Sequence, residues 1–167
     1  MSYPSFVAAG TFQNGIGALT VPQPTGIQNG DLLMLFVETA NEVVTTPTGY
    51  TIAPSSPQGT GTAGAAGGTR LSVFYKIAGT SEGSVSVADS GDHQDAVILA
   101  FRNVDDLNPF NTSSGGVQAT AATSLTLPSV TTSRSQCMIV NAVGTDNDLN
   151  TTANFSAWAN EIGRAHV

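Results

Sequence analysis

Four groups of residues in this sequence could carry chemistry, and the first resembles the start of a calcium loop. Asp146, Asp148 and Asn150 place oxygen ligands at alternate positions, as such a loop does. A complete loop continues with a glycine and has a bidentate glutamate at its twelfth position, where this chain has Thr151 and Ala157. A turn in which Asp and Asn side chains bond their own backbone explains the same residues. We therefore expect no metal, with Asp146, Asp148 and Asn150 as the candidate ligands if one binds.

Histidine and paired carboxylates are the second and third groups. His93 lies among acidic residues at a predicted turn, but one histidine without further His or Cys ligands makes a poor metal site. The chain also lacks the Gly-x-Ser-x-Gly elbow that would present a nucleophile to it. Glu38 and Glu42 follow an apolar run and have the residue type of a glycosidase pair, although acids at a strand exit commonly solvate a loop. The sequence predicts no enzymatic activity and no cofactor.

The fourth group is aromatic. Tyr50, Tyr75 and Trp158 could stack on sugar rings if their side chains are exposed, and Tyr50 and Trp158 are the candidate ligand-binding residues for a glycan. Large aromatic side chains in a small β-domain commonly fill the core instead.

Composition limits which partners are expected. The 167 residues carry a net charge of −7 with five basic residues, which disfavours nucleic acid because phosphate binding needs clustered Lys and Arg. The N-terminus has no basic region followed by a long apolar stretch, so no secretory signal is expected. No run approaches the ~20 apolar residues of a membrane helix. Cys137, the one cysteine, lies in an apolar run and is predicted to be buried without a disulfide.

The elements that must position these residues are predicted to be strands. The 18 glycines, 8 prolines and many Thr, Val, Ser and Asn residues favour short strands and turns over helices. Continuous apolar runs predict three buried central strands, at 32–37, 96–101 and 138–143. Less continuous patterns predict further strands at 6–12, 17–21, 50–52, 71–77, 84–87, 125–130 and 155–158. Residues 54–69 are predicted to form a long surface loop. The pattern predicts an all-β protein, a sandwich of two antiparallel sheets.

Several short motifs resemble those of phage virion and tail-associated β-sandwich modules, over residues 6–158. The motifs are Asn29-Gly30-Asp31-Leu32-Leu33, Gly49-Tyr50-Thr51, Leu71–Ala78, Ala96–Val104 and Leu127-Pro128-Ser129-Val130 followed by the strand at Cys137. The resemblance implies a jelly-roll-like, non-enzymatic structural protein, displayed on the virion as a capsid decoration or tail appendage. It would be made in the host cytoplasm and bind other virion proteins and copies of itself. The alternative is a carbohydrate-binding or host-adhesion module, with its site on residues 54–70 or near Trp158.

The last seven residues do not continue the strand pattern. Within residues 161–167 (EIGRAHV), the sequence IGRAHV is similar to one translated frame of a common sequencing adapter. We expect residues 1–160 to form one domain and 161–167 to be a non-native tail on a sequence of environmental origin, although an ordinary frayed terminus is the alternative. The related modules continue with a further strand after the tryptophan region, so this sandwich is expected to lack its final strand.

Overall fold

The structure is a computed structural model that describes residues 3–40, 42–59, 68–118, 120 and 124–145. These residues form strands and no helix, which confirms the predicted all-β class. The strands are β1 (Ser5–Ala9), β2 (Gln13–Gly15), β3 (Leu19–Val21), β4 (Leu32–Thr39), β5 (Thr51–Ile52), β6 (Arg70–Ile77), β7 (Val85–Val87) and β8 (Gln94–Arg102). No helix able to cross a membrane occurs in this part of the chain.

The larger sheet has six strands around a central pair. Its order is β1-β8-β4-β6-β5, with β2 also paired to β8, and every pairing is antiparallel. β4 pairs along its whole length with β6 on one side and β8 on the other, and all eight of its residues are buried. A strand covered on both faces needs apolar residues at every position, which explains the runs LLMLFV and AVILAF. Two of the three predicted central strands are therefore confirmed.

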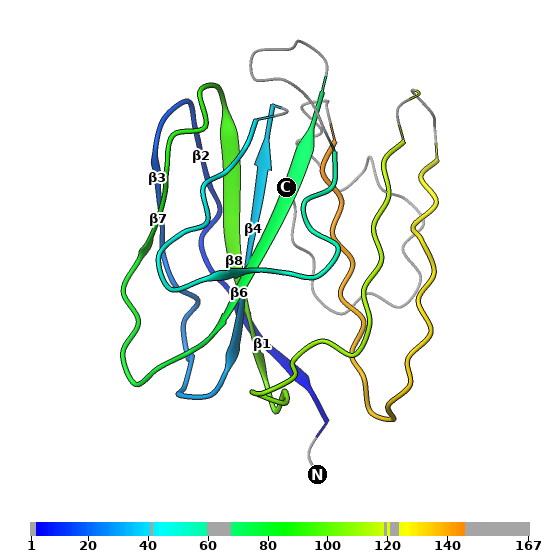
Figure 1. Cartoon of the computed structure of the whole chain (residues 1–167). Coiled ribbons are helices and arrows are strands. Elements are labelled where there is room, and N and C mark those ends of the chain that lie inside the picture. The colour runs from blue at the N-terminus through cyan, green and yellow to red at the C-terminus, as the bar shows by residue number, and fades with distance from the viewer. Residues whose placement is uncertain (1–2, 41, 60–67, 119, 121–123, 146–167) are drawn as a thin grey trace.

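The inner face of this sheet packs against a second, two-stranded sheet. Leu33, Leu35 and Val37 of β4 belong to a core cluster that includes Phe74 of β6 and Ile98 of β8. The opposing layer is the antiparallel pair β3–β7, which adds Leu19, Val21, Val85 and Val87 to the same cluster. Figure 1 shows β3 and β7 side by side at the left of the larger sheet. The predicted sandwich of two antiparallel sheets is thereby confirmed, whereas the jelly-roll connectivity stays a prediction.

The outer face of the larger sheet is covered by described residues of the stretches 104–118, 120 and 124–144, which together we call the outer segment. Leu32, Met34 and Phe36 of β4 form a second core cluster on this face. The residues of the outer segment that pack on the cluster are Val104, Phe110, Met138 and Ala142. Figure 1 shows the described parts of the segment running back and forth beside the six-stranded sheet. Between described residues, no backbone–backbone hydrogen bond involves the segment, so side chains hold it on the sheet. A 2.9 Å hydrogen bond between the Ser55 and Ser113 hydroxyls also joins it to the loop after β5.

The predicted strands at 125–130 and 138–143 are wrong, as is the predicted burial of Cys137. The chain there forms no strand, Ile139 is 60% exposed and the Cys137 thiol is exposed. A continuous apolar run forms a central strand only when both of its faces are covered and its edges are paired. Here Met138 and Ala142 pack on the sheet while Ile139 faces away from it. The strand predicted at 155–158 and the tail at 161–167 lie outside the described residues.

Two further element boundaries differ from the prediction. The strand predicted over 6–12 ends at Ala9. Gly10 follows it at a close approach to another segment, where an added Cβ would lie only 2.7 Å from the Pro22 carbonyl oxygen. Part of the predicted 54–69 loop instead extends the sheet edge. Gln58 and Leu71 exchange backbone hydrogen bonds of 2.9 Å in both directions.

Candidate functional site

Tyr50 lies in a turn between β4 and β5, with its backbone N–H donating to the Pro47 carbonyl at 3.0 Å. The tight turn is permitted by Gly49, whose φ of 80° is readily adopted only by glycine. The side chain points into the inner core and is 7% exposed. Its ring therefore does not form an open platform for stacking on a sugar. Whether Tyr50 contacts a ligand stays a prediction.

The Tyr50 hydroxyl is kept protonated by its surroundings. Burial raises the pKa of Tyr50 to about 12, and the negative charge of Glu82 acts in the same direction. The Gln23 side chain acts to lower the pKa of Tyr50, but less strongly than burial raises it. Neither the Tyr50 hydroxyl nor Gln23 Oε1 has a hydrogen-bond partner among the described residues. At neutral pH the phenol is therefore uncharged, and it cannot act as a base.

An ion pair lies directly beside Tyr50. Lys76 Nζ is 2.7 Å from Glu82 Oε2 and lies 5.8 Å from the centre of the Tyr50 ring. The other carboxylate oxygen, Oε1, accepts a 2.7 Å hydrogen bond from the Gly79 N–H. Burial acts to raise the pKa of Glu82, but the hydrogen bonds from Lys76 and Gly79 and the lysine charge outweigh burial and lower it. The Glu82 carboxylate is therefore ionised at neutral pH, and its two hydrogen bonds fix its position.

Around this ion pair the surface is hollowed. The hollow has a volume of about 350 Å³, and we call it the Lys76 pocket. Its lining residues are Thr48, Tyr50, Lys76, Glu82, Gly83, Ser84, Val85 and Ser86. They come from the turn before β5, the end of β6, the loop after it and the start of β7. The pocket thus combines one aromatic wall, three hydroxyl side chains and a fixed pair of opposite charges.

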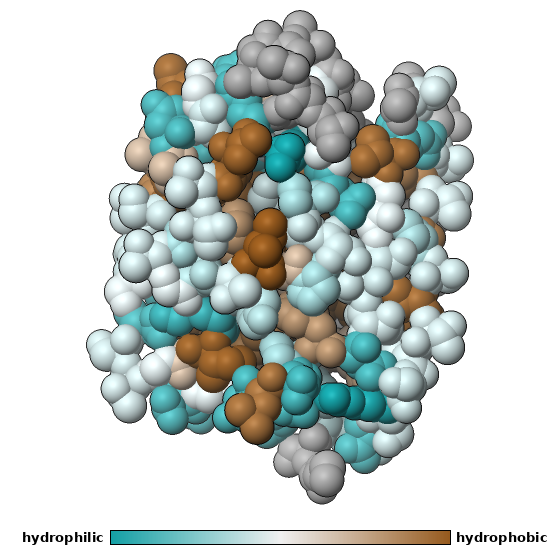
Figure 2. Space-filling view, viewed as in Figure 1, coloured by the Kyte–Doolittle hydropathy of each residue, from teal (hydrophilic) through white to brown (hydrophobic). Residues whose placement is uncertain are grey.

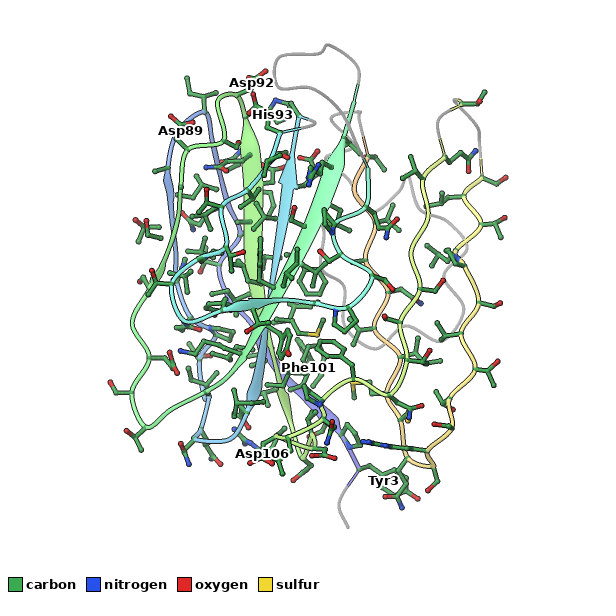
Figure 3. All side chains as sticks on the ribbon, in the orientation of Figure 1. Tyr3, Asp89, Asp92, His93, Phe101 and Asp106 are labelled. Atoms are coloured by element: carbon green, nitrogen blue, oxygen red, sulfur yellow. The ribbon has the colours of Figure 1, made fainter. Side chains whose placement is uncertain are left out.

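The acidic residues predicted as catalytic candidates are engaged in closing loops at one end of the larger sheet. Glu42 is buried, and its Oε2 accepts a 2.7 Å hydrogen bond from the Asp92 N–H. Glu38 accepts a hydrogen bond from the Thr69 hydroxyl. The His93 side chain is exposed, and Figure 3 shows it beside Asp92 at the end of the sheet opposite Phe101. Each of the two glutamates is thus tied to a neighbouring loop.

No grouping of three or more His, Cys, Asp or Glu side chains able to hold a metal occurs among the described residues. The predicted metal candidates Asp146, Asp148 and Asn150 lie outside those residues, as does Trp158. Their roles stay predictions.

A two-pronged ion pair joins Asp31, directly before β4, to Arg102 at the end of β8. Arg102 Nε and Nη2 donate to the two carboxylate oxygens of Asp31 at 2.8 and 2.7 Å, and Nη2 also donates to the Gly26 carbonyl at 2.9 Å. The Gln28 N–H donates to Asp31 at 2.7 Å. The hydrogen bond from Arg102 lowers the pKa of Asp31 despite the burial of the carboxyl group. This fork holds the 26–31 turn against the sheet and is structural.

Sequence reasoning missed Lys76 and Glu82. The alternation of β6 carried a signal for Lys76, since a lone charged residue shares the inner-face register of Phe74. Glu82 lies in a loop, where no periodicity applies. Only the folded chain brings Glu82 next to Lys76 and Tyr50.

With this geometry established, the fold defines the class of protein: an antiparallel β-sandwich whose polar clusters lie at the sheet ends and in one lateral pocket. No family model, curated protein or solved structure matches the chain.

Proposed function

We propose that this chain is a non-enzymatic structural module of a phage particle, a capsid decoration or tail appendage that acts through protein–protein contacts. The phage context rests on the resemblance of its sequence motifs to virion-associated β-sandwich modules. The observation that carries the contact function is the outer segment, which lies on the sheet without backbone pairing between described residues.

A segment whose described residues form no backbone–backbone hydrogen bond with one another or with the sheet favours association. Exposed N–H and C=O groups in an extended run are a template for pairing with a strand of another chain. The outer segment also exposes apolar side chains, with Leu107 at 85% and Ile139 at 60%. On the face shown in Figure 2, apolar side chains lie in separate patches among polar ones. Backbone pairing supplemented by single apolar contacts therefore suits this surface better than one large apolar interface.

The partners proposed are other copies of this chain and neighbouring proteins of the particle. The net charge of −7 opposes non-specific aggregation, so association has to come from directional contacts. Strand pairing supplies such contacts because its hydrogen bonds fix both register and orientation.

Native mass spectrometry of the full chain over a concentration series tests this proposal. We expect oligomers in the unmodified protein and their loss in Ile139→Asp, which places a charge on the outer segment. Val43→Asp is the matched control, because Val43 is 68% exposed and lies outside the outer segment. A strictly monomeric protein that also fails to bind isolated phage capsid or tail proteins would refute the proposal.

Carbohydrate binding or host adhesion is the second candidate function. The sites predicted for it, Trp158 and the 54–70 loop, lie wholly or partly outside the described residues. The observation that favours it is instead the Lys76 pocket.

A further inference from the structure

The Lys76 pocket has a volume comparable to that of small-ligand sites. Its volume of about 350 Å³ falls within the range of roughly 300–1,000 Å³ that small-molecule pockets occupy. It lies beside the inner core, with the Tyr50 ring and the Val85 side chain as apolar parts of its wall. Such sites pair an apolar wall with a few fixed polar groups that orient the ligand.

The polar groups of this pocket are held in place before any ligand arrives. Glu82 is bound through one oxygen to Lys76 and through the other to the Gly79 N–H, each at 2.7 Å. Each carboxylate oxygen can accept further hydrogen bonds, and the ammonium group has protons beyond the one directed at Glu82. A ligand in the pocket therefore meets a hydrogen-bond donor, Lys76, and an acceptor, Glu82, that are already held in position. Binding then loses little side-chain entropy.

The charges select against an ionic ligand. The positive charge of Lys76 is balanced by Glu82 at contact distance, and the chain as a whole carries a charge of −7, which disfavours an anion. A cation would have to compete with Lys76 for the same carboxylate. The remaining polar lining is neutral and comes from the hydroxyls of Thr48, Ser84 and Ser86. Each hydroxyl can donate and accept a hydrogen bond.

A neutral molecule rich in hydroxyl groups fits this combination. Its hydroxyls can donate hydrogen bonds to Glu82 and accept them from Lys76, and they can exchange hydrogen bonds with the hydroxyl groups of the lining. We propose that the Lys76 pocket binds a neutral saccharide unit. This inference deepens the second candidate function and is independent of the self-association proposed above.

A neutral-glycan array probed with the full chain, followed by NMR titration of ¹⁵N-labelled protein with the sugars that bind, tests the proposal. We expect saturable shifts at the backbone amides of Glu82, Ser84 and Ser86. Glu82→Gln keeps the shape of the side chain but removes its charge, and should weaken binding at least tenfold. The matched control is Asp105→Asn, which removes an exposed carboxylate that is paired with Arg134 at 3.2 Å outside the pocket.

Absence of binding across the neutral array would overturn the proposal, because the pocket would then hold water only. Binding confined to acidic sugars would overturn the argument from charge. Saturable binding whose shifts map elsewhere, or that Glu82→Gln leaves intact, would overturn the location. The Ile139→Asp variant should bind sugar normally, so a failure of self-association and a failure of sugar binding are told apart.

Discussion

The two faces of β4 allow the outer segment to be tested by a pair of truncations. Leu35 is fully buried on the inner face, between Phe74 and Ile98 in the strand register. Met34 is its neighbour on the outer face, 8% exposed beneath the outer segment. We expect both Leu35→Ala and Met34→Ala to lower the free energy of unfolding substantially.

The magnitudes follow from the atoms removed. Leu35→Ala deletes three buried carbon atoms at ~0.8 kcal/mol each, and the cavity left behind adds to this loss, so about 3 to 4 kcal/mol is expected. Met34→Ala removes a similar number of side-chain atoms from a slightly exposed site, so we expect it to lower the free energy of unfolding by about 2 to 3 kcal/mol. If the outer segment did not cover Met34, the methionine would be solvent-exposed in the folded state and its truncation would cost under ~0.5 kcal/mol.

Urea denaturation followed by far-UV circular dichroism measures both losses. Met34→Leu conserves volume and should cost less than ~1.5 kcal/mol, while Thr20→Ala on the exposed side of β3 should lie within ~0.5 kcal/mol of the unmodified protein. A Met34→Ala variant as stable as Thr20→Ala, alongside a destabilised Leu35→Ala, would refute the packing of the outer segment on the sheet. Val37→Ala, a smaller truncation on the inner face, replaces Leu35→Ala if that variant does not fold.

Two further predictions concern single polar and backbone positions. Asp31→Asn should lower stability more at pH 7 than at pH 2.5: Arg102 holds the pKa of Asp31 below its unfolded value of ~3.9, so the contribution of this carboxyl is present above that pH and is lost as pH falls. Thermal unfolding at both pH values measures this, and an equal loss at each would contradict it. Gly91→Ala should cost about 1 to 3 kcal/mol, because φ is +113° and an added Cβ would lie 2.7 Å from Glu42 Oε1. Gly17→Ala, with open space around it, is the control; equal melting temperatures for the two would contradict the strain.

Sequence patterns predicted the central strands because those patterns record local burial. The runs that became β4 and β8 are apolar at every position, and both strands lie at the centre of the sheet with covered faces. The same rule failed at 138–143, because an apolar run does not state whether a partner strand lies beside it. Met138 packs against the sheet whereas Ile139 faces away from it, and the hydrophobic pattern of the sequence does not distinguish the two residues.

The candidate site was less predictable for a related reason. Tyr50 stood out by residue type, but its burial depends on a turn that folds it against β6. Glu82 had no sequence signal, since its role comes from contacts made across a loop with Lys76 and Gly79. Sites of this kind, built from residues of several different elements, become visible only when the elements are placed in space.

The two layers that cover the larger sheet, the β3–β7 pair and the outer segment, link the fold to the two proposed functions. A strand as apolar as β4 cannot leave either face in water, so it requires a layer on each side. The inner layer is the hydrogen-bonded pair β3–β7, which is only two strands wide, and the Lys76 pocket lies beside it at the end of β6.

The outer layer meets the same burial requirement through side chains such as Phe110 and Met138, without using the backbone for pairing between described residues. Stability therefore depends on the inward-facing side chains of the outer segment, and the strand pairing with another chain that we propose would use its backbone. For this reason Met34→Ala should impair folding, whereas Ile139→Asp should impair association and leave the fold intact.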